Sequence, residues 1–378
     1  MTRTFTLASR GSQLAQIQTN IVLDACEQLS SSNHELKPSF KTSFMATGGD
    51  KNQSQALYLL GGKALWTKEL EVALKENHVD MLVHSLKDVP TTLPEGCVIG
   101  AVLKREDPVD SLVVKQGENW RSLEDLPSGS VVGTSSVRRV AQLKRRYPYL
   151  NFLDVVSLIY FHVCHKIQFA LAWELVSFDP AFRCAKVKFS LEFGRNTRLA
   201  KLDAVDGPYA ALVLAKSGLV RLGMGDRATS DILPPTLYYA VSQGALAVEV
   251  RSDDAEAIEL CKKITHRDTL WRCMAERACL RVLEGGCSVP VGVESTLSAV
   301  DNSEILTLTG CVTSVDGMEH VQHTLKEIIA SLEDAEKVGE KLAKALMEIG
   351  AKKILDDINV DRDRRVAEAK SVDEAKEG

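Results

Sequence analysis

Short apolar strands alternate with helical segments through the first two-thirds of this chain, and this alternation constrains the fold more than any other feature. Residues 5–7 form an apolar run, and from Ser12 onward apolar residues recur at helical spacing. A second apolar run at 79–83 leads into a polar turn, and a later stretch beginning at Ser130 repeats the scheme. Alternating strands and helices are typical of α/β layers. We therefore predict two successive α/β units.

After Asp254 the pattern changes. A helical pattern through Leu270 precedes strand patterns at 289–294 and 305–312, and a long amphipathic helical pattern follows. This stretch has the size of a separate domain, and 378 residues fit two or three domains in all. We predict a third, α+β unit of roughly a hundred residues.

Composition narrows the possible classes of protein. No stretch reaches the roughly 18 uncharged apolar residues of a membrane span, and the first residues lack a signal-peptide core. The nine cysteines never form a CxxC pair, which argues against a disulfide framework and a zinc site. A net charge of −5 argues mildly against nucleic-acid binding. We expect a cytoplasmic protein with no membrane, nucleic-acid or metal partner.

Two segments depart from ordinary globular composition. Residues 156–191 hold seven of the 21 aromatic residues of the chain and no glycine. Residues 352–378 carry 15 charged residues in 27, which predicts a solvated helical extension or a disordered tail.

Three polar turns follow predicted strands, where α/β proteins bind their ligands. Helix-start N–H groups, hydroxyls and guanidinium groups in such turns form a receptor for anions. Lys63 and Arg198 add two more cations. Together they indicate a ligand with several negative charges, and the alternative is that they are ordinary helix caps and surface charges. The turns are Ser9-Arg10-Gly11-Ser12, His84-Ser85-Leu86-Lys87-Asp88 and Gly133-Thr134-Ser135-Ser136-Val137-Arg138-Arg139.

Three single residues invite a catalytic interpretation. Asp88 is an acid among cations and could stabilise a positive intermediate or move a proton, although a helix-capping role is more common for such an aspartate. His84 alone is typical of a packed core residue. Cys287 lies between glycines and a proline, which suits a nucleophile or an attachment point, whereas an isolated cysteine is more often inert.

Taken together, these motifs resemble the porphobilinogen deaminase (hydroxymethylbilane synthase) family. The resemblance runs from residue 5 to about 350, in family order. The matching motifs are Ser9-Arg10, Ser12-Gln13-Leu14-Ala15, Gly61-Gly62-Lys63, Thr67-Lys68-Glu69-Leu70-Glu71, His84-Ser85-Leu86-Lys87-Asp88-Val89-Pro90, the 133–139 turn, Thr197-Arg198-Leu199 and Gly285-Gly286-Cys287-Ser288-Val289-Pro290.

The resemblance implies two α/β domains like those of periplasmic binding proteins, plus a smaller α+β C-terminal domain. It places the first domain at 1–103 and 244–263, the second at 108–240 and the third at 266–351, before the tail. It implies a monomeric transferase that condenses four porphobilinogen molecules head to tail, with loss of ammonia, on a dipyrromethane cofactor. The product is hydroxymethylbilane, a precursor of haem and other tetrapyrroles.

The resemblance also implies roles for single residues. Cys287 matches the cysteine that carries the dipyrromethane through a thioether, and Asp88 matches the catalytic aspartate. The residues that match the cofactor- and substrate-binding groups are Arg10, Ser12, Lys63, Ser85, Lys87, Thr134, Ser135, Ser136, Arg138, Arg139 and Arg198.

One departure from the family pattern bears on activity. Glu192-Phe193-Gly194 stands where the family has Arg-Gly-Asn, directly after the aromatic segment 156–191. We interpret this segment as translated intron sequence or a faulty gene model, with a lineage-specific insertion as the alternative. It raises a second functional hypothesis, that of an impaired isoform or an anion-binding module without turnover.

Overall fold

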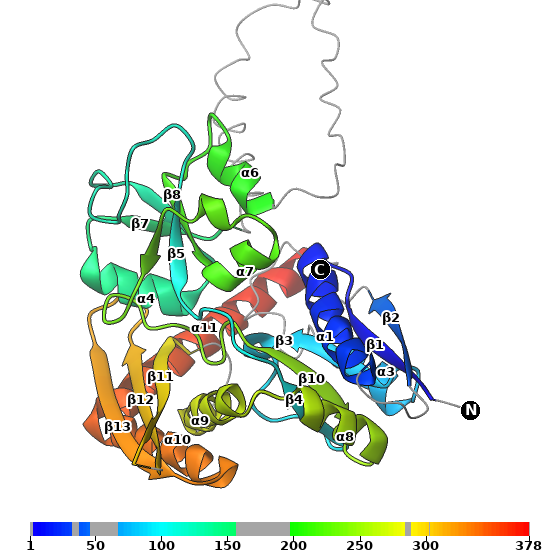
Figure 1. The fold of residues 1–378 in the computed structure, drawn as a ribbon. Coiled ribbons are helices and arrows are strands. Elements are labelled where there is room, and N and C mark those ends of the chain that lie inside the picture. The colour runs from blue at the N-terminus through cyan, green and yellow to red at the C-terminus, as the bar shows by residue number, and fades with distance from the viewer. Residues whose placement is uncertain are drawn as a thin grey trace, which may run out of the picture.

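The computed structural model describes residues 3–31, 38–45, 67–155, 197–283, 289–301 and 303–377. These residues build three β-sheets with helices packed against them (Figure 1). Two sheets have five strands each, and the third has three.

The first sheet combines parallel strands from the start of the chain with one strand from much later. Its order is β2-β1-β3-β10-β4; β1 runs parallel to β2 and β3, and β10 runs antiparallel to both of its neighbours. The strands are β1 (Thr4–Arg10), β2 (Ser39–Met45), β3 (Met81–Ser85), β4 (Cys97–Val102) and β10 (Leu246–Arg251). The helices of this unit are α1 (Gln13–Ser31), α3 (Lys68–Lys75), α8 (Ala255–Ile264) and the short 3₁₀ turn η3 (Leu86–Asp88).

The second sheet repeats this arrangement. Its order is β7-β6-β8-β5-β9; β6 runs parallel to β7 and β8, and β5 runs antiparallel to both of its neighbours. The strands are β5 (Asp110–Val114), β6 (Val131–Gly133), β7 (Asn151–Leu153), β8 (Ala211–Ala215) and β9 (Ser230–Ile232). The helices are α4 (Val137–Arg146), α6 (Thr197–Asp203), α7 (Lys216–Arg221) and η4 (Gly225–Arg227).

The chain passes between these two sheets twice. It leaves the first sheet after β4 to begin β5, and it returns after β9 to form β10 in the middle of the first sheet. Buried apolar residues of β1, β3 and β10 make one core, and those of β5, β6 and β8 make another. The predicted fold class of two α/β units with a smaller α+β unit is confirmed.

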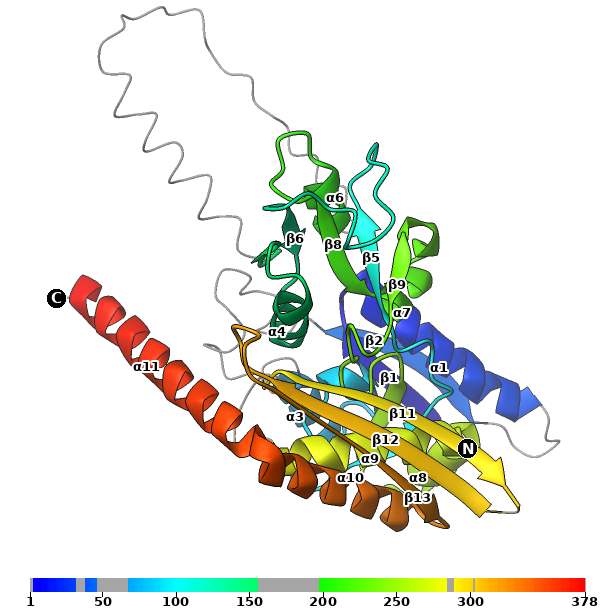
Figure 2. The same ribbon diagram turned by 90° about the vertical axis from the view of Figure 1, so that its left-hand side faces the viewer.

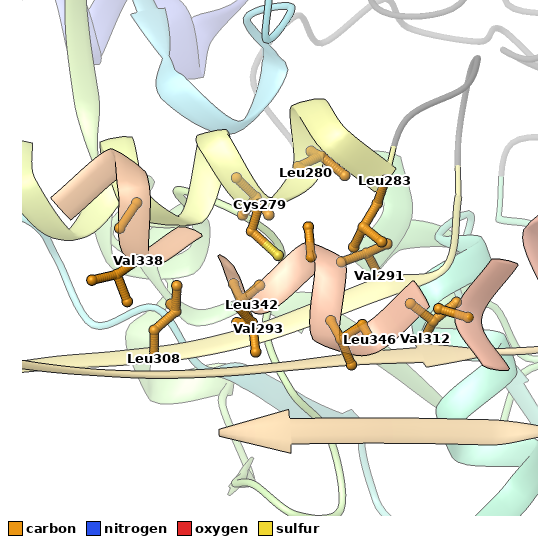
Figure 3. Packing of buried hydrophobic residues seen from close by; sticks show 14 of the residues in the cluster. Cys279, Leu280, Leu283, Val291, Val293, Leu308, Val312, Val338, Leu342 and Leu346 are labelled. Atoms are coloured by element: carbon orange, nitrogen blue, oxygen red, sulfur yellow. The ribbon is translucent and has the colours of Figure 1, made fainter. Parts of the chain in front are cut away.

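The third unit is an antiparallel sheet covered by two helices. Its strands are β11 (Val291–Val300), β12 (Ser303–Thr313) and β13 (His320–Ile329), and its helices are α9 (Arg267–Leu283) and α10 (Leu332–Leu346). Figure 3 shows Leu342 and Leu346 packed between the strands and α9. A fully buried leucine of this kind stabilises the fold by about 1.5–3 kcal/mol. Gly339 lets α10 approach α9, since a Cβ there would lie 2.0 Å from the Ala275 carbonyl oxygen.

The charged C-terminal segment is helical. After the π turn η5 (Met347–Ala351), α11 (Lys352–Glu377) begins with Ile354 and Leu355 buried in the third core. Beyond these residues α11 extends away from the rest of the protein (Figure 2). Of the two predictions for this tail, a helical extension is the one the structure shows.

Several boundaries differ from those predicted. The strand predicted at 289–294 is β11 and begins at Val291, and the apolar run at 79–83 is β3, which begins two residues later. The sequence patterns did not predict β4, β5 or β13. β13 alternates exposed polar and half-buried residues, so its apolar signal is weak.

Candidate active site

The turns that follow β1 and β3 lie at one edge of the first sheet, because the two strands are parallel. Arg10 is the last residue of β1, and Asp88 ends the turn η3 directly after β3. Asp88 is exposed and belongs to the walls of two cavities. The predicted catalytic aspartate therefore stands between two chambers.

The smaller chamber, called here the first-sheet cavity, has a volume of about 70 Å³ and is built only from the first unit. Its polar lining residues are Arg10, Ser12, Gln18, Thr67, His84, Ser85 and Asp88.

The larger chamber, called here the central cavity, has a volume of about 330 Å³ and is lined by all three units. Its apolar walls include Leu280 of α9 and Val291 of β11. Its polar lining residues are Lys87, Asp88, Ser135, Ser136, Arg138, Arg139, Arg198 and Gln243.

Ten of the predicted site residues line these two cavities. Thr134 does not: it is buried behind the turn, where its Oγ1 accepts a hydrogen bond from the Ser136 backbone N–H at 3.3 Å. Lys63, Cys287 and the segment 156–191 lie outside the described residues. Val289, two residues after Cys287, does line the central cavity.

The predicted hydroxyl ligands all have partners within the protein. Ser12 Oγ accepts a hydrogen bond from the Ala15 N–H and caps α1, and Ser136 Oγ caps α4. Ser85 Oγ accepts a hydrogen bond from Gln18 at 2.8 Å, and Ser135 Oγ donates one to Asp154 at 2.5 Å. These serines therefore fix the shape of the turns, as the capping alternative predicts, while lining the cavities.

Two of the four predicted arginine ligands share one buried aspartate. Arg138 Nη2 and Arg139 Nη2 donate to the two carboxylate oxygens of Asp110, at 2.8 and 2.6 Å. Burial by itself would raise the pKa of Asp110, but the two guanidinium groups outweigh it and hold that pKa well below its ordinary value. Within the part of the chain that the structure describes, the buried Nε atoms of both arginines have no hydrogen-bond partner. Both arginines line the central cavity, where one aspartate charge faces two guanidinium charges.

Gln243 connects this cluster to the turn that carries Asp88. Its Nε2 donates to Asp110 Oδ1 at 2.8 Å, and its Oε1 accepts a hydrogen bond from Lys87 Nζ at 3.3 Å. Sequence reasoning did not identify Asp110 or Gln243 as site residues. A signal existed for Asp110, because it lies two residues before the apolar run 112–114, and a carboxylate buried beside such a run is rarely without a partner.

A larger hollow elsewhere contains none of the predicted residues. It measures about 600 Å³ and lies where α4 ends near β13. In the described parts of the chain, no group of acidic, histidine and cysteine residues could hold a metal ion. Those same parts contain no helix with the length and apolar composition needed to cross a bilayer.

Comparison with known proteins agrees with this geometry. The family model described as "Porphobilinogen deaminase, dipyromethane cofactor binding domain" matches residues 5–159 and 188–259, and the corresponding C-terminal domain matches residues 270–348. The chain belongs to the porphobilinogen deaminase family. Within this family match, the gap at 160–187 falls inside the aromatic segment 156–191.

Relatives named porphobilinogen deaminase match nearly the whole length of this chain. Porphobilinogen deaminase of Schizosaccharomyces pombe is 40% identical over 93% of this chain and 94% of its own length. The Nostoc enzyme is 43% identical over 94% and 95%, and the Saccharomyces cerevisiae enzyme is 40% identical over 95% and 98%. The chain is thus a member of a family of tetrapyrrole-synthesis enzymes and contains a domain that binds a dipyrromethane cofactor.

The residues of the central cavity fit that cofactor. A dipyrromethane made from two porphobilinogen units carries four carboxylate arms, which require cationic donors. Four cationic side chains line this cavity, namely those of Lys87, Arg138, Arg139 and Arg198.

Proposed function

We propose that this protein is a hydroxymethylbilane synthase, a transferase that joins four porphobilinogen molecules head to tail and releases ammonia. The observation that carries the proposal is the position of Asp88, which stands in the walls of both cavities and faces cations in each. When bound through Cys287, the dipyrromethane supplies the pyrrole carbon on which the chain grows. The residues of the protein then have to hold carboxylates, stabilise a cation and move protons.

We assign carboxylate binding to residues from both α/β units. Arg10 serves the first-sheet cavity, and Lys87, Arg138, Arg139 and Arg198 serve the central cavity. The hydroxyls of Ser12 and Ser136 cap α1 and α4, the helices that begin beside the first-sheet cavity and the central cavity. Lys63 is proposed to add a further cation, as the family resemblance implies.

We assign to the Asp88 carboxylate the stabilisation of positive charge on a reacting pyrrole and the handling of its protons at Oδ. Its exposed position at the shared wall suits a group that must reach both the growing end and the incoming unit.

We also propose that the three sheets mark three domains: residues 1–103 with 244–263, residues 108–240 and residues 266–351. In this proposal the protein is a monomer in the cytoplasm. Its partner is the small-molecule substrate alone, with no nucleic acid or membrane.

The intact mass of the purified chain tests the proposal directly. We expect a mass above that of the 41.4 kDa polypeptide by one dipyrromethane, and a coloured adduct with Ehrlich's reagent. Both signals should disappear in Cys287→Ser, which removes the thioether. Cys311→Ser is the matched control, because this buried thiol, whose pKa burial raises to about 12, should carry nothing.

An unmodified Cys287 would instead support the second hypothesis, that of an impaired isoform or an anion-binding module. The observation that favours it is the interruption of the family match at 160–187, next to the missing Arg-Gly-Asn. Transcript reads continuous across codons 155–196 in mature message would show the segment to be a true part of the protein.

Lys87 gives a prediction about pH. Burial lowers its pKa to about 8, so its charge is present below that pH and lost above it. We expect KM for porphobilinogen to rise about tenfold between pH 7 and pH 9.5 as one charge-assisted hydrogen bond is lost. In Lys87→Arg the guanidinium stays protonated, so the rise should vanish. An equal rise in both proteins would refute this role for Lys87.

A further inference from the structure

Behind the first-sheet cavity lies a buried cluster of one imidazole and two carboxylates. His84 of β3 and Glu249 of β10 lie on the same face of the first sheet, and Glu71 comes from α3, which packs against that face. Glu249 is fully buried, and the other two are 7% exposed. None of the functional assignments above uses these groups.

The cluster is short of positive charge. His84 Nε2 lies 3.1 Å from Glu249 Oε2, without the alignment of a full hydrogen bond. Among the described residues, no lysine or arginine forms a salt bridge with Glu71 or Glu249. Among the described residues, the His84 imidazole is the one basic group within 4.0 Å of either carboxylate.

Buried carboxylates without a cation hold protons instead. Burial raises the pKa of Glu71, and the nearby charge of Glu249 raises it further. Burial and Glu249 also raise the pKa of the Cys97 thiol, on the neighbouring strand β4, to about 11. Both shifts favour the protonated, uncharged forms of Glu71 and Cys97.

One member of this cluster, His84, borders the first-sheet cavity. His84 and Thr67 line the first-sheet cavity together with Asp88. A cavity of about 70 Å³ with several polar walls has room for water molecules that could connect Asp88 to His84. Because Nε2 of His84 faces Glu249, Nδ1 is the ring nitrogen left for such an exchange.

We propose that His84 is the proton-exchanging partner of Asp88 and that Glu249 is the positioning residue that orients it. The inference rests on the proposed function. In each condensation a carbon–carbon bond forms, a pyrrole carbon loses its proton, and the C–N bond of the incoming ammonium group breaks to release ammonia. The lost proton passes from Asp88 through water to His84 Nδ1 and leaves on the ammonia as ammonium.

Variants of His84 and Glu249 test the relay. We expect His84→Gln to lower kcat about 100-fold with KM unchanged, and Glu249→Gln to lower it about tenfold. Added imidazole should partly restore His84→Ala, a result that a packing role does not predict. The matched control is His78→Gln, which removes an exposed histidine 3.5 Å from Glu76 and should leave kcat unchanged.

A second measurement does not depend on turnover. The infrared spectrum of the purified full-length protein at neutral pH should show a carboxylic-acid C=O band that is absent in Glu71→Gln. If His84→Gln folds poorly, the near-isosteric Glu249→Gln carries the kinetic test.

The outcomes separate the two proposals. Wild-type kcat in both His84→Gln and Glu249→Gln, or no rescue by imidazole, would overturn the relay while the proposed function stands. A wild-type protein without turnover would refute the proposed function, and the infrared comparison alone would then decide whether the cluster stores a proton. An unchanged band in Glu71→Gln would show that it does not.

Discussion

Asp88→Asn is expected to lower kcat about 10²–10⁴-fold, the range over which a positioned acid–base group contributes to turnover. Asparagine keeps the size of the side chain but removes its negative charge and its capacity to accept a proton. The exposed position of Asp88 implies that the fold and the attached cofactor persist. Steady-state kinetics with porphobilinogen, together with the intact mass, would measure both effects.

The control for this variant is Asp206→Asn, an exposed aspartate of the second unit that lines neither cavity. Its kinetics should equal those of the wild type. Turnover within threefold of wild type in Asp88→Asn would remove Asp88 from the mechanism. Loss of the cofactor mass in that variant would assign Asp88 to cofactor assembly instead.

The second large effect is expected from Asp110→Asn. Asp110 is 1% exposed and is the carboxylate that both Arg138 and Arg139 contact. Removing one partner of a buried ion pair leaves uncompensated charge and costs about 3–5 kcal/mol. We expect a lower midpoint of urea unfolding for the second unit, and weaker binding of carboxylates because the arginines are no longer held in place.

Asp231→Asn provides the matched comparison in the same sheet. Asp231 contacts Lys216 at 2.5 Å, but its side chain is 31% exposed. The substitution should therefore lower the free energy of unfolding by no more than about 1 kcal/mol. Equal losses of unfolding free energy in the two variants would contradict the larger contribution assigned to the buried Asp110.

Acid should reproduce the effect of Asp110→Asn in the wild-type protein. The pKa of Asp110 is depressed on folding, so its contribution to stability is present above the ordinary aspartate value near pH 4 and lost as pH falls further. In Asp110→Asn, the free energy of unfolding should change less with pH below about pH 4 than it does in the wild type.

The sequence predicted the α/β class because strand and helix periods are local properties. It also predicted most of the cavity lining, because turns after parallel strands lie at one edge of a sheet. Ser85 and Lys87 are found in this way without knowledge of tertiary contacts.

What the sequence could not supply was the set of buried partners. These partners are Asp110, Gln243 and Glu249, which lie in or beside apolar strands. Each of them contacts a residue that is far away in the sequence. The contact between Gln243 and Asp110, for example, joins positions 133 residues apart. A large separation in sequence also explains why His84 resembled an ordinary core residue. Its carboxylate partner is on β10, which begins 162 residues later in the chain.

The placement of β10 between β3 and β4 has a consequence for biosynthesis. A ribosome delivers β1 to β4 early, but the strand that joins β3 to β4 emerges only after the whole second sheet has been made. The second unit can therefore acquire its structure first, during synthesis, while the first unit waits unfinished. Any delay in the folding of the second unit extends the time during which the open edges of β3 and β4 are available to other chains.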